Sequence, residues 1–322
     1  MQVLQTFFIE GDTAVAREPD ITFDGENYLA VWSAGEFGGG SNIRCARITP
    51  SGVVLDTGIL CGMDHYCEYH PAIAFDGNRS LVVWYNYVDP PAGVYARFVG
   101  RDGVPVGREI TIRFLPENTD NDPAIAFLDS VYLVVWSEPS PNADDDIYGQ
   151  IVLKDGALYG TCIPIATGSI YQCQPRICAL DSMFVVVWSE FDVIRGQFVS
   201  IDGTLTGNNF HVSSPIERPR DFPDIAYQAG QCLAVWHEFI NDDHEIYGNL
   251  DVNPWVQEAQ EPQYVPHRYI PTIMAHTIDL YHRTGHRIYD ILGREILSQH
   301  PAPGIYFIEH RGEIVSKIVL IR

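Results

Sequence analysis

Short apolar runs that end in tryptophan recur along the first 254 residues at nearly constant intervals. The runs are LAVW, LVVW, LVVW, VVVW and LAVW, and they end at Trp32, Trp84, Trp136, Trp188 and Trp236. Successive tryptophans are 52, 52, 52 and 48 residues apart. Uninterrupted apolar runs are typical of strands that are covered on both faces. A strand with one solvent-exposed face instead alternates apolar and polar positions. The interval therefore predicts five copies of one repeated unit.

A proline keeps the same intervals and marks another strand in each unit. The segments PDITF, PAIAF, PAIAF, PRICA and PDIAY begin at Pro19, Pro71, Pro123, Pro175 and Pro223. Turn pairs such as Asp24-Gly25 and Asp76-Gly77 close these segments and favour a tight hairpin into the apolar run. Each unit is therefore expected to begin with a proline-headed strand.

Two more strands complete the unit. The third reads RCARI, YARFV, YGQIV, RGQFV and YGNLD, and four copies end at Ser51-Gly52, Asp102-Gly103, Asp155-Gly156 and Asp202-Gly203. The fourth contains TGILC, REITI, CIPIA or NFHVS. A small residue recurs in the third strand, where a bulky neighbour is expected to need room: Ala46, Ala96, Gly149, Gly196 and Gly248. Four-stranded units at this period predict an all-β fold, a five-bladed β-propeller over residues 1–254.

The fifth unit lacks a fourth strand. The N-terminal segment LQTFFIEG has the pattern of the missing strand and precedes the first proline-headed segment. We expect Gln5 to Gly11 to close blade five, because this pairing removes two exposed sheet edges.

A different composition follows Pro254. Residues 255–266 read as a Pro- and Gln-rich linker, and residues 267–322 as a small C-terminal β-sandwich-like module. The segments RIYDILGREI (287–296) and PGIYFIEHRGEIVSKIVLIR (303–322) resemble the C-terminal sorting domain of bacterial type IX secretion. The matching positions are Tyr289, Asp290, Gly293, Arg294, Pro303, Gly304, Tyr306 and the strand from Lys317 to Arg322.

This resemblance implies that secretion machinery recognises the module, exports the chain across an outer membrane and often attaches it to the cell surface. An ordinary accessory β-domain is the alternative. We expect an extracellular or cell-surface protein. Residues 1–16 contain neither a basic nor an apolar signal region, so a signal peptide is absent from this numbering.

The acidic charge is confined to the repeats. The formal net charge is −22, with 13 basic and 35 acidic residues before Pro254 and 7 of each after it. Such a surface repels phosphate backbones, so nucleic acid and anionic membranes are poor partners. No window reaches the about 18 to 20 apolar residues that a transmembrane helix needs.

The seven cysteines are an odd number, so at least one is free or pairs with another chain. Cys61 and Cys67, and likewise Cys162 and Cys173, are close enough in predicted loops for local disulfides in an oxidising compartment. The other three fall in predicted strands and are expected to be buried: Cys45, Cys178 and Cys232.

Long polar loops gather on one face of the predicted propeller, which is the usual place for binding. Glu138, Glu190 and Glu238 on that face each follow a repeat tryptophan by two residues. Paired carboxylates suggest a glycosidase, and five-bladed propellers include furanosidases and related enzymes, which this chain resembles in fold alone. The two catalytic carboxyl groups of a glycosidase lie about 5 to 10 Å apart, and equivalent positions of neighbouring blades should lie farther apart than that. Structural hydrogen bonding is therefore favoured for these glutamates.

Charged residues also flank the repeat prolines, nearer the expected axis. They are Glu18, Asp20, His70, Asp122, Arg176 and Asp224. After ring closure Asp20 and Asp224 should approach each other, with Arg176 next, which makes these three the candidate catalytic pocket. His70 and Asp122 join the three glutamates on the candidate binding face. Simple salt bridging explains the cluster equally well.

Acidic loops offer oxygen ligands suited to calcium, although no recognised calcium-loop motif is present. The candidate ligands are Asp144, Asp145, Asp146, Asp242, Asp243 and Glu245. No other cofactor is expected.

Two functional hypotheses follow. The main one is a non-enzymatic propeller that binds a surface polymer or glycan, or assembles with its own copies into a layer or fibre. The alternative is a glycosidase-like carbohydrate-active enzyme that uses carboxylates of the loop face near the pore.

Overall fold

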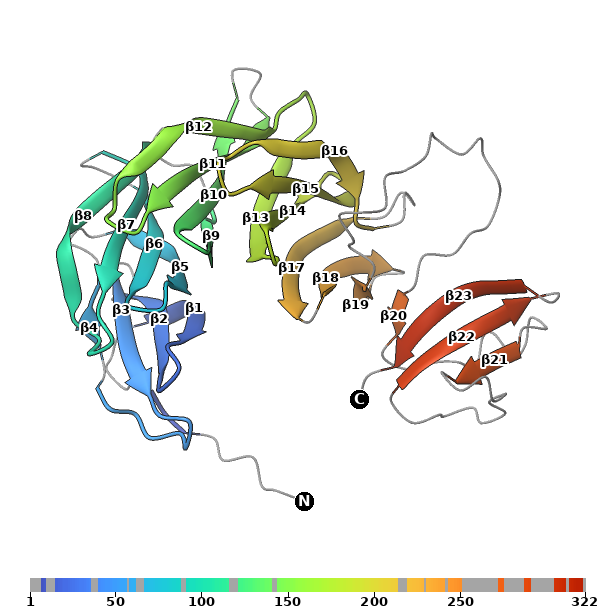
Figure 1. Cartoon of the computed structure of the whole chain (residues 1–322), viewed down its shortest axis with the longest axis horizontal. Helices are drawn as coiled ribbons and strands as arrows, with labels where there is room; N and C mark the ends of the chain where they lie inside the picture. Colours follow the sequence, from blue (N-terminus) through green and yellow to red (C-terminus); the bar gives the residue numbers. More distant parts are fainter. Residues whose placement is uncertain are drawn as a thin grey trace. The chain divides into compact units, whose positions relative to one another are not determined.

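The computed structural model is an all-β chain with a five-bladed propeller (Figure 1). It describes residues 7–9, 15–35, 40–56, 58–61, 67–87, 91–115, 121–140, 144–213, 219–228, 230–240 and 243–250. The backbone alone is described for residues 240, 243, 244, 272–274, 287–290, 304–310 and 313–320. No helix with the length and apolar character to cross a bilayer occurs in these ranges.

Each blade is a sheet whose strands lie side by side in the order of the chain. Blade one comprises β1 (Val15–Phe23), β2 (Tyr28–Gly35), β3 (Ser41–Ile48) and β4 (Ile59–Leu60). Blade two comprises β5 (Glu68–Phe75), β6 (Ser80–Asn86), β7 (Gly93–Val99) and β8 (Pro105–Phe114). Blade three comprises β9 (Ala124–Leu128), β10 (Val131–Pro139), β11 (Asp145–Leu153) and β12 (Leu158–Ala166).

The last two blades continue the order. Blade four comprises β13 (Gln172–Ala179), β14 (Met183–Glu190), β15 (Val193–Ser200) and β16 (Leu205–His211). Blade five contains three strands in the described residues: β17 (Arg220–Gln228), β18 (Gln231–Ile240) and β19 (Asp243–Asn249). The strand content of all five units agrees with the repeats in the sequence.

The tryptophan-ending runs form the second strand of each blade and are buried, as predicted. All five repeat tryptophans are at most 5% exposed. Trp84 belongs to a cluster formed by the facing sides of blades one and two, and Trp136 belongs to the corresponding cluster of blades two and three. Trp84 and Trp136 therefore help to hold adjacent blades together through apolar burial.

The small residues of the third strand leave room for side chains of the fourth, as the repeat predicts. A Cβ atom added at Gly149 would lie 2.8 Å from Cδ1 of Ile165. One added at Gly196 would lie 2.6 Å from the ring of Phe210. A larger residue at either position would overfill a packed sheet face.

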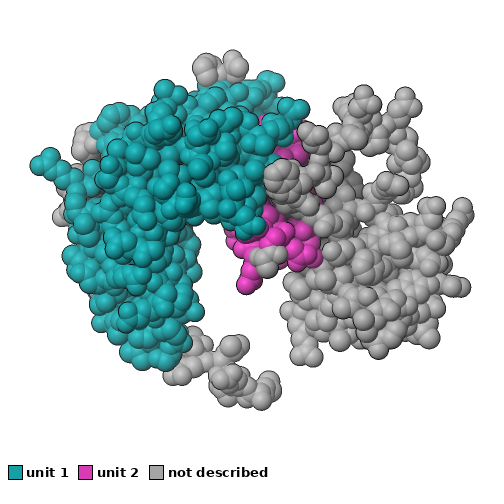
Figure 2. Space-filling model, in the orientation of Figure 1, with its two compact units in different colours: residues 1–186, 197–208 teal, residues 187–196, 209–322 magenta. Residues whose placement is uncertain are grey.

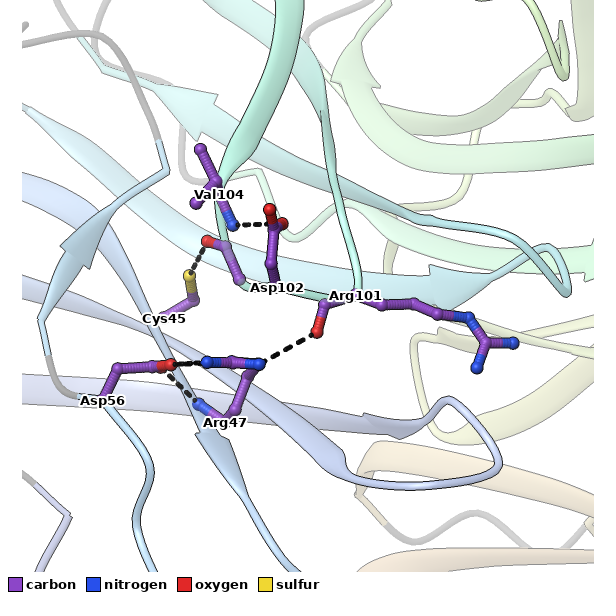
Figure 3. A network of polar contacts seen from close by, with 7 residues as sticks. Cys45, Arg47, Asp56, Arg101, Asp102 and Val104 are labelled. Carbon is purple, nitrogen blue, oxygen red and sulfur yellow. Dashed lines mark hydrogen bonds and ion pairs between the residues drawn. The ribbon is translucent and has the colours of Figure 1, made fainter.

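Polar contacts join blades one and two beside the β7–β8 turn (Figure 3). Arg47 of β3 bonds Asp56 through Nε, at 2.6 Å, and donates from Nη1 to the carbonyl oxygen of Arg101 at 3.4 Å. Cys45 Sγ lies 3.6 Å from the carbonyl oxygen of Gly103. Gly103 has a φ of 78°, which favours glycine in this tight turn. These contacts therefore hold blades one and two together beside the β7–β8 turn.

The candidate disulfides are not formed in the structure, which has all seven cysteines as free thiols. Cys61 directly follows β4 and is buried in the core between blades one and two. Its thiol hydrogen-bonds that of Cys45, and this bond together with burial raises the pKa of Cys61 well above its usual value. The cause is the short strand β4, which brings Cys61 back across β3.

The expected closing strand falls largely outside the described residues. Phe7 lies against Gly52, where an added Cβ would meet its ring at 3.2 Å. Ile9 packs against the apolar cluster of blade one that contains Trp32 and Ala46. Pairing of Gln5 to Gly11 with β19 stays a prediction.

The chain divides into two compact units (Figure 2). One contains residues 1–186 and 197–208, and the other contains residues 187–196 and 209–322. Toward the C-terminus, β20 (Thr272–Met274), β21 (Arg287–Asp290), β22 (Gly304–His310) and β23 (Glu313–Leu320) form one sheet in the order β20-β23-β22-β21. Of the sorting motif, Gly293, Arg294 and Pro303 lie outside the described residues.

Candidate functional site

The residue before the repeat proline adopts a left-handed backbone conformation in four blades. The φ angles are 54° at Glu18, 52° at His70, 55° at Gln174 and 54° at Phe222. Residues with side chains rarely adopt this conformation, which costs on the order of 1 to 3 kcal/mol. The strand pairing shifts at this point in β1, β5 and β17. Such bulges re-aim a side chain and are frequent beside functional sites.

In blades one to three this position brings together two carboxylates and a histidine. His70 Nδ1 lies 2.8 Å from Asp122 Oδ1 and 3.8 Å from Glu18 Oε2. Because both distances start at one nitrogen, the two carboxylate oxygens are at most 6.6 Å apart, the sum of 2.8 and 3.8 Å. All three side chains are partly exposed, so a ligand can reach them.

The environment keeps Asp122 ionised. Burial raises the pKa of its carboxyl group, but the hydrogen bond to His70 and the charges of His70 and Arg176 outweigh burial and hold the pKa below its usual value. Glu18 Oε2 accepts hydrogen bonds from Ser33 Oγ and from the backbone N–H of His70, both at 2.8 Å. The site therefore holds one stabilised carboxylate beside a second one fixed by hydrogen bonds.

The three residues of the expected catalytic pocket have different surroundings. Asp20 Oδ2 accepts the backbone N–H of Ile73 in blade two, and Oδ1 accepts that of Ile21, both at 2.8 Å. These bonds fasten blade one to blade two. Arg176 contributes its charge to Asp122. Asp224 is exposed, and its Oδ1 accepts the N–H of Ile225 at 2.8 Å.

The three repeated glutamates each bind an arginine. Arg113 binds Glu138 with two parallel bonds of 3.0 and 2.8 Å, and Trp136 Nε1 donates to Glu138 Oε2 at 2.9 Å. The other two pairs join Nε of Arg195 to Glu190 at 3.0 Å and Nε of Arg220 to Glu238 at 2.9 Å. Each glutamate is thus used as a buried hydrogen-bond acceptor in the scaffold.

The acidic loops do not assemble a metal site in the part of the chain that is described. No group of three or more His, Cys, Asp and Glu side chains there is placed to hold an ion. Asp146 Oδ1 instead accepts the backbone N–H of Gly168 at 3.0 Å. Burial, with the nearby charges of Asp146 and Asp144, raises the pKa of Asp145 despite a hydrogen bond to Tyr171. Asp242 and the side chain of Asp243 lie outside the described residues.

Comparison with solved structures found several proteins that this chain is similar to. A thermostable family-43 glycoside hydrolase is 10% identical, with a TM-score of 0.47 and coverage of 75% of this chain and 91% of that one. An endo-arabinase from Bacteroides thetaiotaomicron is 15% identical, with a TM-score of 0.47 and coverage of 75% and 96%. Trypanosoma rangeli sialidase is 10% identical, with a TM-score of 0.51 and coverage of 73% and 47%.

No protein-family model matches the chain, and the search of curated proteins found no match. At identities of 10 to 15% the structural likeness shows the fold alone.

The main functional hypothesis from the sequence is corrected by these comparisons. A non-enzymatic binding or assembly protein was expected, whereas the similar solved structures are glycoside hydrolases and sialidase-like proteins. The glycosidase-like alternative is the hypothesis that agrees with them. The physical reason for the error is that sequence spacing does not show that the bulge residues Glu18 and His70 come together with Asp122.

Phe222 was also missed as a candidate functional residue. It occupies the same position before a repeat proline as Glu18 and His70. Comparing that position across the five blades was the signal available, since it holds Glu, His, Asp, Gln and Phe.

Proposed function

We propose that the propeller hydrolyses glycosidic bonds with the carboxylates of Asp122 and Glu18. The observation that carries the proposal is the pair of carboxylate oxygens at most 6.6 Å apart around His70. Glycosidases hold two carboxyl groups about 5 to 5.5 Å apart when they retain anomeric configuration and about 6.5 to 9.5 Å apart when they invert it. The bound of 6.6 Å includes the retaining separation, which is the arrangement that we propose.

The lowered pKa of Asp122 suits it to act as the nucleophile. Its oxygen bonds the anomeric carbon while the bond from that carbon to the glycosidic oxygen breaks, and Glu18 acts as the general acid that gives a proton to the departing oxygen. A water molecule then displaces Asp122 from the anomeric carbon and returns a proton to Glu18. His70 acts as a positioning residue, because its imidazole lies between both carboxylates.

We also propose that this activity is exercised outside the cell. The proposal is supported by the sorting-domain resemblance of the C-terminal segments, which implies recognition by type IX secretion machinery. An extracellular location suits a hydrolase of polymers that are too large to be imported. Secretion of a reporter fused to residues 267–322, and its loss when Gly304 and Tyr306 are replaced by alanine, tests this part.

The test of the hydrolase is a panel of arabinan, xylan, mannan, starch and sialylated oligosaccharides. We expect reducing sugar to be released from at least one neutral substrate. Asp122→Asn should lower kcat about 100- to 10,000-fold, the usual loss for a group that acts directly in acid–base or nucleophilic catalysis.

The matched control is Asp155→Asn, which alters a turn carboxylate between β11 and β12 that bonds the N–H of Ala157. It should leave the rate within about twofold of wild type. Equal rates for wild type and Asp122→Asn on every hydrolysed substrate would contradict the proposal.

A further inference from the structure

Blade five uses the bulge position to present an aromatic ring. Phe222 takes the position that Glu18 and His70 occupy in blades one and two, with the same left-handed φ of 54°. Its side chain is 61% exposed although it is large and apolar. A single exposed phenylalanine is ordinary, but one held in a strained conformation on a bulge requires a reason.

The side chain of His237 stacks on this ring, and an acidic residue lies opposite His237 in the sheet. The ring of His237 stacks against Phe222, with centroids 6.2 Å apart and an interplanar angle of 29°. His237 lies directly opposite Asp221 in the pairing of β17 with β18. Burial raises the pKa of Asp221, while His237 lowers it and the charge of Asp192 raises it further. The imidazole of His237 therefore contacts the exposed ring, and the carboxyl group of Asp221 belongs to the residue paired with His237.

We infer that Phe222, with His237 and Asp221, forms a stacking subsite for a neutral sugar of a glycan chain. The C–H face of a sugar packs on an aromatic ring, and carboxylates accept hydrogen bonds from its hydroxyl groups. This inference rests on the proposed carbohydrate-directed function and adds a binding residue to it.

The charge of the propeller selects the class of ligand. Nucleic-acid bases also stack on aromatic rings, but their phosphates need clustered Lys and Arg. The repeats instead contain 13 basic and 35 acidic residues, and Asp221 directly precedes Phe222 in the chain. The same charge disfavours sialylated or other anionic glycans, so the ligand is neutral.

Binding should be measured in an Asp122→Asn background so that no polymer is degraded. Affinity electrophoresis through arabinan, xylan, mannan or starch, with polysialic acid as the anionic comparator, supplies the dissociation constants. We expect a neutral polymer to bind and Phe222→Ala to weaken it about tenfold, since stacking on an aromatic ring is worth about 1 to 3 kcal/mol in nucleic-acid complexes. Phe222→Trp should retain the affinity.

The matched control is Phe114→Ala, because Phe114 of β8 is 60% exposed and does not have the left-handed φ of Phe222. Its removal should not change binding. Equal binding by the Phe222→Ala and Phe114→Ala variants, tighter binding of polysialic acid, or no binding of any polymer overturns the subsite. If wild type hydrolyses nothing while Phe222 still controls binding, the subsite stands and the proposed hydrolysis fails.

Discussion

Two sets of carboxylates occur at repeated positions of this propeller, and their surroundings differ. The glutamates of the second strands, Glu138, Glu190 and Glu238, are buried and each binds an arginine. Glu18 and Asp122 lie before the repeat prolines, are partly exposed and share one histidine. The repeated glutamate after each tryptophan pairs with an arginine of the blades and is buried. The position before the repeat proline leaves its carboxyl group accessible, so acidic residues at the two positions have different uses.

The largest stability effect is expected at the most buried scaffold pair. The side chains of Arg220 and Glu238 are 2% and 5% exposed, and Arg220 also donates to Ser213 Oγ at 3.1 Å. Arg220→Ala leaves Glu238 buried without its cation, so we expect a loss of about 3 to 5 kcal/mol in the free energy of unfolding. Urea unfolding measures it.

The control is Arg195→Ala, in which the lost arginine is more exposed and the loss should be about 1 kcal/mol or less. Replacing Arg220 and Glu238 together by Met and Leu should recover most of the stability, because no charge is left buried. Equal losses of unfolding free energy for Arg220→Ala and Arg195→Ala would show that burial of the arginine does not determine how much each pair contributes.

A smaller effect is expected from the repeated small residue of blade three. Gly149→Ala places a Cβ 2.8 Å from Ile165 Cδ1, which should destabilise the protein by about 1 to 3 kcal/mol. Ile165→Val removes that atom and should restore most of the stability in the double variant. Gly168→Ala is the control, since its new Cβ would meet nothing closer than 4.0 Å. Additive losses in the double variant would show that the contact is not the cause.

Much of the scaffold could be predicted from sequence because packing repeats with the chain. The tryptophan runs, the proline-headed strands and the small third-strand residues each meet a packing need of one strand. They recur at one interval because every blade has the same need. The arginine partners could not be predicted. They come from β8, β15 and β17, which are not equivalent places in the blades.

The candidate site could be predicted only in part. The sequence indicates charged residues near the repeat prolines, but it favours Asp20, Arg176 and Asp224 as the pocket. It does not show the left-handed conformation at Glu18 and His70, because φ there is set by the bulge in strand pairing and not by a glycine. The contact between Cys45 and Cys61 was missed for a similar reason: it depends on where β4 pairs with β3.

The smallest effect concerns the acid range. The fold lowers the pKa of Asp122, so its ionised form contributes stability above the unfolded-state pKa of about 3.9, and this contribution is lost as pH falls through the lower folded value. Wild type should therefore exceed Asp122→Asn in stability at pH 5.5, and the difference should shrink toward pH 3. Chemical denaturation across that range measures it. A difference that stays constant with pH would show that the fold does not stabilise the Asp122 carboxylate.

The proposed hydrolysis requires that the carboxyl groups before the repeat prolines act in catalysis and that the scaffold glutamates do not. Its most direct test compares kcat, per mole of folded protein, for Asp122→Asn, Glu18→Gln, Glu138→Gln and Glu190→Gln on the neutral glycan that wild type hydrolyses. We predict losses of about 100-fold or more for the first two variants and less than about threefold for the last two. Full activity in Asp122→Asn and Glu18→Gln, or a large loss of kcat in folded Glu138→Gln or Glu190→Gln, would contradict the account.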